Sequence, residues 1–368
     1  PFKSWESGVT TIKAAVDAAV AGDTVLVAGG TYLVPSPISV TNGITVASQE
    51  GADATIVQGE QLNPCFRVVH SNAVIDGFTI RNGHAGFSDL RGGGMWLDGG
   101  TVRNCSFRYN TSVDEGGGLF LNRARAENCF FMSNTCWNGG GVFASNGVLL
   151  SCVIVMNHAQ TDGGGAMLAG NESAMLNCTI SDNTADSAGG GVYVFADAPL
   201  VQNSIVYGNS ATFGPNYFNQ SAQGRFSYCC TFPQTNAAGN ITNGPSFANP
   251  AAGDYQLTAD SPCLDSGTNI ALAAATTDIR GQKRIFNQRV DMGAYEGSIR
   301  SAGVDHTDGV QTTWDVLIQA RCQLQGASDA RAPAWTNVGS VVTATQSRIT
   351  LTDTNEAPAR IYRLLWLQ

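Results

Sequence analysis

Residues 116–165 read GGGLFLNRARAENCFFMSNTCWNGGGVFASNGVLLSCVIVMNHAQTDGGG, and this stretch holds three Gly triplets at nearly equal intervals. Across the chain five such triplets begin at Gly92, Gly116, Gly139, Gly163 and Gly189, in steps of 24, 23, 24 and 26 residues. A repeat of this length is too short for a pair of helices, and it suits one turn of a solenoid made of short strands. The triplets therefore predict a stack of similar coils.

Two further markers keep the same phase as the triplets. One is a small thiol or hydroxyl residue, at Cys105, Cys129, Cys152, Cys178 and Ser204. The other is an asparagine five residues later, at Asn110, Asn134, Asn157, Asn183 and Asn209. Two residues after the thiol column come Phe107, Phe131, Ile154, Ile180 and Val206. Because side chains alternate along a strand, the thiol and the apolar columns are both expected to face the core.

The repeat also predicts what each marker does. Equivalent positions of parallel coils are poorly placed for disulfides, so the column cysteines should be buried free thiols. Cys230 and Cys263, in irregular segments, are better candidates for a bridge. The asparagines should hydrogen-bond from coil to coil, and the Gly triplets should form a corner that requires positive φ or close approach. No GKS or GKT follows a triplet, so a phosphate loop is not expected.

The N-terminal segment predicts a cap. Residues 10–21 carry apolar side chains at helical spacing, with Thr10 or Thr11 as N-cap and Gly22 as the end. We expect this helix to cover the open end of the core. The regular coils are expected over residues 76–224, within a β-helix that spans 1–297.

Charge and composition exclude several classes of protein. The net charge is −9, so a nucleic-acid binder is not expected. No apolar run approaches the ~20 residues of a transmembrane helix. The chain begins at Pro1, which we interpret as a mature N-terminus left after removal of a signal peptide. The expected location is secreted or cell-surface, by bacterial-type export.

These motifs resemble those of known exported proteins. The run TIKAAVDAAVAGDTVLVAGGTY, residues 11–32, resembles the opening of bacterial pectin-lyase-like right-handed parallel β-helix proteins. The pairing of GG[AG]-aliphatic with FxxN, as in Phe107–Asn110, is similar to the repeats of chlamydial polymorphic outer-membrane proteins. Residues 245–297, with GDYQLTADSPCLDSGTN and DIRGQKRIFNQRVDMGAYEG, resemble the closing module of the choice-of-anchor β-helix group. That resemblance implies that Asp265, Asp278 and Asp291 brace loops.

The pattern changes after residue 297. Short alternating runs over 300–368 predict a small β-sandwich, which is similar to tail modules of exported bacterial proteins. The fold class is therefore all-β: a right-handed parallel β-helix with an N-terminal capping helix and a small C-terminal β-sandwich.

Apolar residues also occupy positions that should face outward. They form two columns: Trp96, Phe120, Phe143, Met167 and Tyr193 after the triplets, and Phe130, Met132, Val153, Val155 and Tyr207 beside the thiol column. A soluble monomer rarely exposes such a stripe. We expect the tail sandwich or, preferably, a second chain to cover these columns, which makes them a candidate binding or assembly surface.

No catalytic residues can be assigned. Asp89, Asp114, Glu115 and Asp162 lie close before the triplets and predict an acidic strip, which could bind calcium, act on a glycan or simply form turns. Arg103, Arg108, Arg123 and Arg125 lie on neighbouring coils and could provide a lyase base or a solvated edge. The four histidines, His70, His84, His158 and His306, share no repeat phase, so no metal cluster is expected.

Two functions follow from these features. The first is an exported structural or adhesive surface protein, self-assembling through the apolar columns into a homo-oligomer or filament. The alternative is a polysaccharide lyase or glycoside hydrolase of the β-helix type, with a glycan as partner and calcium as the one cofactor that could be required. A large self-complementary apolar interface would favour the first. A groove with two carboxylates, or with an arginine beside calcium, would favour the second.

Overall fold

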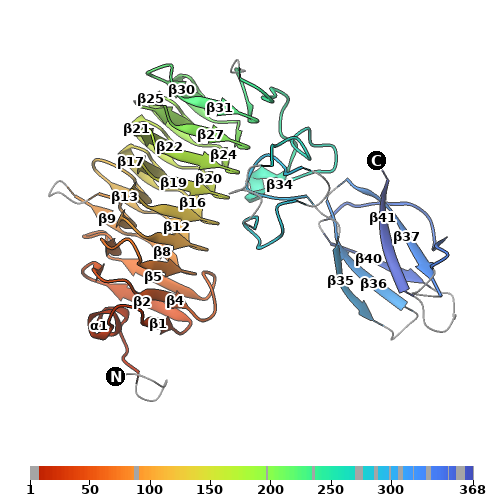
Figure 1. The fold of residues 1–368 in the computed structure, drawn as a ribbon, viewed down its shortest axis with the longest axis horizontal. Helices are drawn as coiled ribbons and strands as arrows, with labels where there is room; N and C mark the ends of the chain where they lie inside the picture. Colours follow the sequence, from red (N-terminus) through yellow and green to blue (C-terminus); the bar gives the residue numbers. More distant parts are fainter. Residues whose placement is uncertain are drawn as a thin grey trace.

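The computed structural model of the chain is a stack of coils along one axis, followed by smaller sheets (Figure 1). It describes residues 8–86, 91–195, 198–233, 237–269, 277–285, 289–297, 300–305, 310–317, 319–328, 333–346, 348–353 and 361–367. In these ranges no helix has the length and apolarity needed to cross a membrane.

Four parallel sheets, A to D, form the walls of the stack. Sheet A contains β1 (Thr24–Val27), β4 (Thr45–Ser48), β7 (Val74–Asp76), β11 (Thr101–Arg103), β15 (Arg125–Glu127), β19 (Val148–Leu150), β23 (Ala174–Leu176), β27 (Leu200–Gln202) and β31 (Arg225–Ser227). Sheet B contains β2 (Gly30–Val34), β5 (Thr55–Gly59), β8 (Thr79–Arg81), β12 (Ser106–Arg108), β16 (Phe130–Met132), β20 (Val153–Val155), β24 (Thr179–Ser181), β28 (Ile205–Val206) and β32 (Cys230–Thr231).

The other two sheets complete each coil. Sheet C contains β3 (Ile38–Val40), β6 (Phe66–Val68), β10 (Met95–Asp98), β14 (Leu119–Asn122), β18 (Val142–Ser145), β22 (Ala166–Ala169), β26 (Val192–Val194) and β30 (Tyr217–Asn219). Sheet D contains β9 (His84–Ala85), β13 (Thr111–Ser112), β17 (Thr135–Asn138), β21 (His158–Asp162), β25 (Thr184–Ala188) and β29 (Ser210–Phe213). From β7 to β30, each coil runs through sheets A, B, D and C in that order.

The register places like residues on like, as the repeat predicts. Phe107 pairs with Phe131, and Phe131 with Ile154, on successive strands of sheet B. The rings of Phe107 and Phe131 stack with their centroids 4.8 Å apart. The predicted inward columns are therefore confirmed as the core.

All ten cysteines are buried free thiols, including the predicted column. Burial raises the pKa of Cys105 to about 12, because a thiolate would lose its hydration there. Cys230 and Cys263 lie in one apolar cluster and are also free thiols, so the bridge expected between them is absent from the structure.

The predicted asparagine ladder is present between sheets B and D. The Oδ1 of Asn157 accepts hydrogen bonds of 2.9 Å from the backbone N–H and the Nδ2 of Asn134. The Nδ2 of Asn157 in turn donates to Asn183 Oδ1 and to the carbonyls of Phe131 and Val155. Each amide is buried and satisfied by the coils on either side.

The Gly triplets form the corner between sheets D and C. The first glycine of each triplet has positive φ, for example +69° at Gly139. A Cβ on the second, Gly140, would lie 2.4 Å from the carbonyl oxygen of Gly164 on the next coil. Both predicted reasons for glycine, backbone conformation and close approach, therefore apply.

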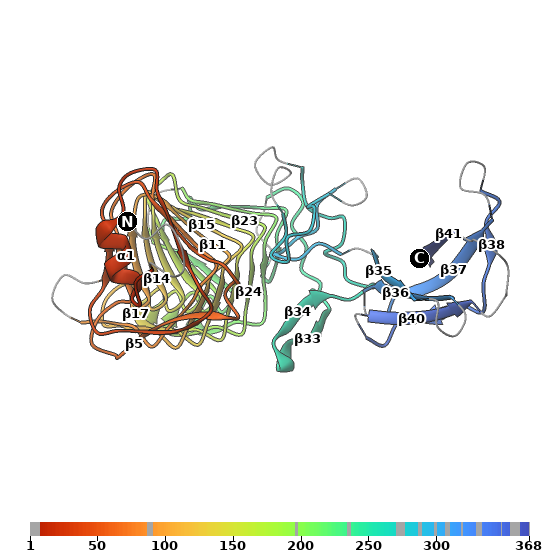
Figure 2. The ribbon, with the colours of Figure 1, turned by 90° about the horizontal axis from the view of Figure 1, so that it is seen from below.

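The capping helix α1 (Ile12–Ala18) is shorter than predicted and lies across one end of the stack (Figure 2). Thr11 is its N-cap and accepts a hydrogen bond from the N–H of Ala14. Ile12 and Val16 are buried against the core. The helix ends before Gly22 because the chain is already extended at Ala19.

Two groups of strands follow the coils. β33 (Phe247–Asn249) and β34 (Asp254–Leu257) form a hairpin around a short 3-10 turn, η2 (Pro250–Ala252). In the tail, β35 (Arg300–Asp305), β36 (Val310–Asp315) and β40 (Arg348–Asp353) form one antiparallel sheet, and β37 (Arg321–Ala327), β38 (Thr336–Asn337), β39 (Val342–Thr343) and β41 (Ile361–Leu367) form another. Trp314, Leu324 and Trp366 pack in the core that the two tail sheets share.

Candidate functional site

The first outward apolar column, on sheet C, is not an open surface. Phe120, Phe143, Met167 and Tyr193 are only 4–7% exposed. Their side chains pack in one cluster with Ala188 of sheet D, and the rings of Phe120 and Phe143 stack 5.7 Å apart. Trp96, at the start of the column, is half-buried beneath the guanidinium of Arg67. The chain itself therefore covers this column, and neither the tail nor a second chain is needed for it.

The second column, on the outer face of sheet B, is covered by the segment 245–297, which we call the closing module. Val153 and Val155 are fully buried against Tyr255 and Ala294 of that module. Phe130, Met132 and Tyr207 are partly buried at its margins. Figure 1 shows the module beside β16, β20 and β24. The closing module, and not the tail sandwich, therefore covers the centre of this column.

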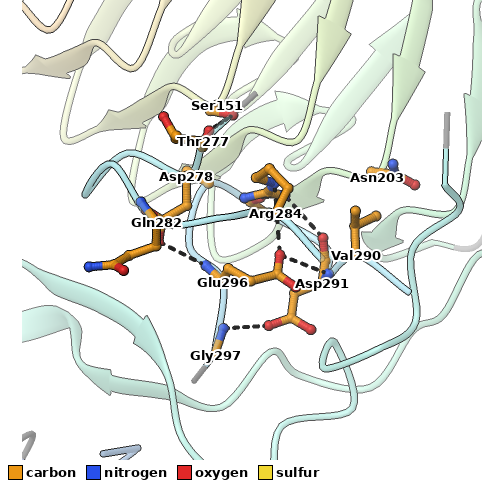
Figure 3. A network of polar contacts seen from close by, with 12 residues as sticks. Ser151, Asn203, Thr277, Asp278, Gln282, Arg284, Val290, Asp291, Glu296 and Gly297 are labelled. Carbon is orange, nitrogen blue, oxygen red and sulfur yellow. Dashed lines mark hydrogen bonds and ion pairs between the residues drawn. The ribbon is translucent and has the colours of Figure 1, made fainter. Parts of the chain in front are cut away.

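A network of buried charges holds the closing module together (Figure 3). Arg284, Asp291 and Glu296 are at most 2% exposed, and the Nε of Arg284 lies 3.8 Å from Glu296 Oε2. Burial, before any other cause, raises the pKa of Glu296 to about 9 and that of Asp291 to about 7. Removal from water disfavours the charged carboxylates, and the single buried arginine offsets this only in part.

The other predicted loop braces lie in the same module. Both carboxyl oxygens of Asp278 accept backbone N–H groups, including those of Gln282 and Glu296. Asp265 lies beside this network, where its backbone N–H donates to Asp291 Oδ1. Thr277 joins the module to the coils, since its carbonyl accepts from Ser151 and its hydroxyl from Asn128. The module is thus fastened to the corner between sheets A and B.

The residues of the acidic strip that the structure describes have partners within the protein. Glu115 forms an ion pair of 3.1 Å with Arg91, and Asp114 lies 4.0 Å from the same guanidinium. Burial raises the pKa of Glu115. Asp162 accepts the backbone N–H of Ala188, its register partner on the next coil of sheet D. Asp89 lies outside the described residues.

No group of three or more potential metal ligands, histidines included, comes together in the part of the chain that the structure describes. His84 and His158 do share a repeat position on sheet D, three coils apart, so the prediction that the histidines share no phase is wrong for this pair. Each instead has its Nδ1 within hydrogen-bond distance of a threonine hydroxyl on the next coil. His306 lies outside the described residues.

The structure also separates the four predicted arginines. Arg103 pairs with Asp76 and Arg125 with Glu127 on the outer face of sheet A. Arg123, at the corner between sheets C and A, lies 3.9 Å from Asp98. A shallow cavity of about 410 Å³ at this corner is lined by Arg123, Arg125 and Glu172. Because charges of both signs line this cavity, it favours neither an anionic nor a cationic ligand.

Arg108 differs from these three, because it lies on the half of sheet B that the closing module leaves open. Directly beside it in register, on β8, is Arg81. Arg81 donates to Gln58 Oε1 at 2.9 Å and Arg108 to Ser106 Oγ at 2.8 Å, and both partners are neutral. Among the described residues, neither guanidinium forms an ion pair with a carboxylate. Two adjacent arginines thus keep most of their donors unused.

The surroundings of this pair are apolar and neutral. The Arg108 guanidinium lies 5.5 Å from the centre of the Phe130 ring, and Tyr109 at the adjoining corner is 54% exposed. No acidic residue occupies an outward position of β2, β5, β8, β12 or β16. Adjacent strands lie ~4.8 Å apart. Guanidinium groups on two such strands are therefore suited to bind carboxylate or sulfate groups that follow one another along a polymer.

The sequence markers do not identify Arg81 as a candidate site residue. Its coil carries Phe78 where later coils have cysteine, and Gly83 where they have asparagine, so the markers are missing. The spacing could still have found it, because Arg81 precedes Arg108 by the same interval that separates Phe78 from Cys105.

Comparison with known proteins agrees with this fold. The model of the right-handed β-helix region matches residues 42–246, which is more than half of the chain. The chain therefore belongs to the right-handed β-helix family, and its pectin-lyase-like architecture is confirmed. No curated protein matches the chain.

Several solved structures are similar to parts of this chain at low identity. A pectin methylesterase from Aspergillus niger is 15% identical, with a TM-score of 0.41 over 63% of this chain and 81% of that one. A pectin methylesterase in complex with a hexasaccharide is 12% identical, with a TM-score of 0.40 over 70% and 97%. The ORF18 protein of Geobacillus virus E2 is 13% identical, with a TM-score of 0.30 over 100% and 75%.

Proposed function

We propose that this chain is an exported, cell-surface or secreted protein that binds an acidic polysaccharide across the open half of sheet B. The observation that carries the proposal is the register pair Arg81 and Arg108, which has only neutral hydrogen-bond partners. The resemblance of its repeats and closing module to exported surface proteins supports the same location.

The chemistry of the pair favours an anionic polymer over a neutral one. Each guanidinium presents a planar fork that matches a carboxylate or sulfate group, and charge-assisted hydrogen bonds are about twice as strong as neutral ones. Half-buried Gln58 and Thr79 next to the pair could hydrogen-bond hydroxyl groups of the same polymer. Phe130 and exposed Tyr109 provide ring surface for sugar faces.

The other functions expected from the sequence have less support. Assembly through the apolar columns would need open surface, and the chain itself buries most of the first column and the centre of the second. Glycoside hydrolysis needs two carboxylates on one face, and the open half of sheet B has none at its outward positions. Binding is therefore the function that we propose, with cleavage by a lyase or hydrolase as an outcome that the same experiment can detect.

The test compares matched variants on charged and neutral glycans. We expect immobilised polygalacturonate to retain the protein and neutral dextran not to, with retention that falls as salt rises. Arg81→Gln with Arg108→Gln should weaken binding about 100-fold, since each lost charge-assisted contact contributes ~1.5 kcal/mol. Arg103→Gln with Arg125→Gln, which removes an equal charge from sheet A, should change binding little.

Two results would contradict the proposal. One is equal loss in the sheet A and sheet B variants, which would mean that only net charge matters. The other is binding to dextran that is as strong as binding to polygalacturonate. New reducing ends or unsaturated uronate in the incubation would replace binding by catalysis as the function.

A further inference from the structure

Strand β41 forms an outer edge of the second tail sheet. It pairs with β37 over seven consecutive residues without a register shift, and no described strand pairs with its other side. Such an edge presents a row of unused backbone N–H and C=O groups. Proteins usually protect long edges with charges, proline, a bulge or a covering segment.

The other described edges of the tail are protected in these ways, whereas β41 has no such protection within the described residues. β38 and β39 are only two residues long, and β35 contains a register shift. The exposed residues of β40 are Arg348, Thr350 and Thr352. β41 reads IYRLLWL, with neither proline nor lysine, and its outer face exposes Ile361 and Leu365.

The single charge in β41 does not guard the edge either. The Nε of Arg363 donates to Gln325 Oε1 at 2.8 Å, on the neighbouring strand β37. Its guanidinium also lies 4.3 Å from the centre of the Trp335 ring. Both contacts hold the side chain over its own sheet and away from the open side of β41.

We infer that β41 pairs with β41 of a second copy of this chain, antiparallel and about a two-fold axis at Leu364. This register places Tyr362 opposite the partner's Trp366, so that an aromatic pair extends the core of each tail. Arg363 lies opposite the partner's Leu365, and no like charges face each other. The segment is therefore complementary to itself, as an isologous dimer requires.

This dimer is separate from glycan binding, because it uses the tail and not sheet B. The sequence also predicts self-association, but through the apolar columns. In the dimer inferred here, the interface is an exposed strand edge. Two copies joined at the tail would present two polysaccharide sites in one particle, which raises avidity for a polymer.

The test measures the mass of the full chain in solution by light scattering. We expect a particle of twice 38.5 kDa that dissociates on dilution. Leu365→Lys changes an exposed side chain and places a lysine opposite the partner's Arg363 twice, so it should weaken the dimer at least about 10-fold. Thr352→Lys, on exposed β40, is the matched control and should leave the dimer intact.

A charge exchange distinguishes the interface from damage to the fold. Adding Arg363→Glu to Leu365→Lys makes each lysine face a glutamate of the partner, so the double variant should recover the dimer. A chain that is monomeric at every concentration would overturn the inference. So would a dimer that Leu365→Lys leaves unchanged, or a double variant that stays as weak as the single one while its circular dichroism is native.

Discussion

Asn157 shows how a single residue serves three coils. Its side chain accepts two hydrogen bonds from Asn134 and donates to Asn183, at depth where no water can replace them. Removal of the amide leaves those partners unsatisfied, and each unsatisfied buried group costs ~1–3 kcal/mol. The ladder is therefore a chain of mutually dependent groups.

We expect Asn157→Ala to lower the free energy of unfolding by about 3 kcal/mol, measured by urea denaturation. Thr184→Ala is the matched control, because Thr184 is exposed and bonds only at the surface to His158. Its loss should be below about 0.5 kcal/mol. Equal losses at the two positions would mean that the ladder contributes no more than a surface contact.

At this scale the sequence predicted the residues that repeat and missed those that do not. The asparagine and cysteine columns recur in fixed phase, so the role inferred for a residue in one repeat applies to the equivalent residues of the others. Arg81 lies in a coil without the markers, and what distinguishes Arg108 from Arg103 is its partner. Which carboxylate a side chain reaches depends on the neighbouring coil and has no periodic signal.

The corners of each coil determine where its strands end. Between sheets D and C the backbone of one coil passes so close to the next that a Cβ has no room at the second glycine of a triplet. Sheet D itself was not predicted, because its strands lack alternating apolar residues. Pairing between equivalent backbone groups of successive coils makes it a sheet.

Gly140→Ala should therefore destabilise the chain by more than about 3 kcal/mol or prevent folding, because the new Cβ would lie 2.4 Å from one carbonyl oxygen and 2.5 Å from another. Thermal unfolding of the purified variant, or its yield in the folded state, measures this. At Gly29 a Cβ would meet only the flexible side chain of Glu50. Gly29→Ala should then be nearly neutral, and a comparable loss there would refute the steric explanation.

For the whole molecule, the decisive feature is the closing module against sheet B. The sequence predicted that the apolar columns need a cover and misidentified what provides it. A repeat predicts contacts between neighbouring coils, whereas Thr277 meets Asn128 across 149 residues of chain. Irregular residues 245–297 have no period from which to predict where they pack.

The buried carboxylates make the stability of this arrangement depend on pH. Glu296 and Asp291 have folded-state pKa values of about 9 and about 7, raised mainly by burial, against ~4 when unfolded. The folded chain binds more protons in this window, so their contribution is fully present below pH ~4 and is lost as pH rises through 7 and 9.

We expect Glu296→Gln, which resembles the protonated form, to flatten the decline in unfolding free energy between pH 5 and 9 by on the order of 2 kcal/mol. Urea denaturation at several pH values measures the slope. Glu127→Gln, at the surface beside Arg125, should keep the original slope. A slope that Glu296→Gln leaves unchanged would assign the pH dependence to other groups.

The position of the closing module also has a consequence for the order of folding. Each coil needs only the coil before it, so winding can proceed by local steps along the chain. The module cannot dock until the strands β16 to β28, which lie earlier in the sequence, have formed the surface that it covers. Folding should then be vectorial, with the stack of coils forming first. During this step the face that carries Val153 and Val155 is exposed to water, and the closing module packs on it last.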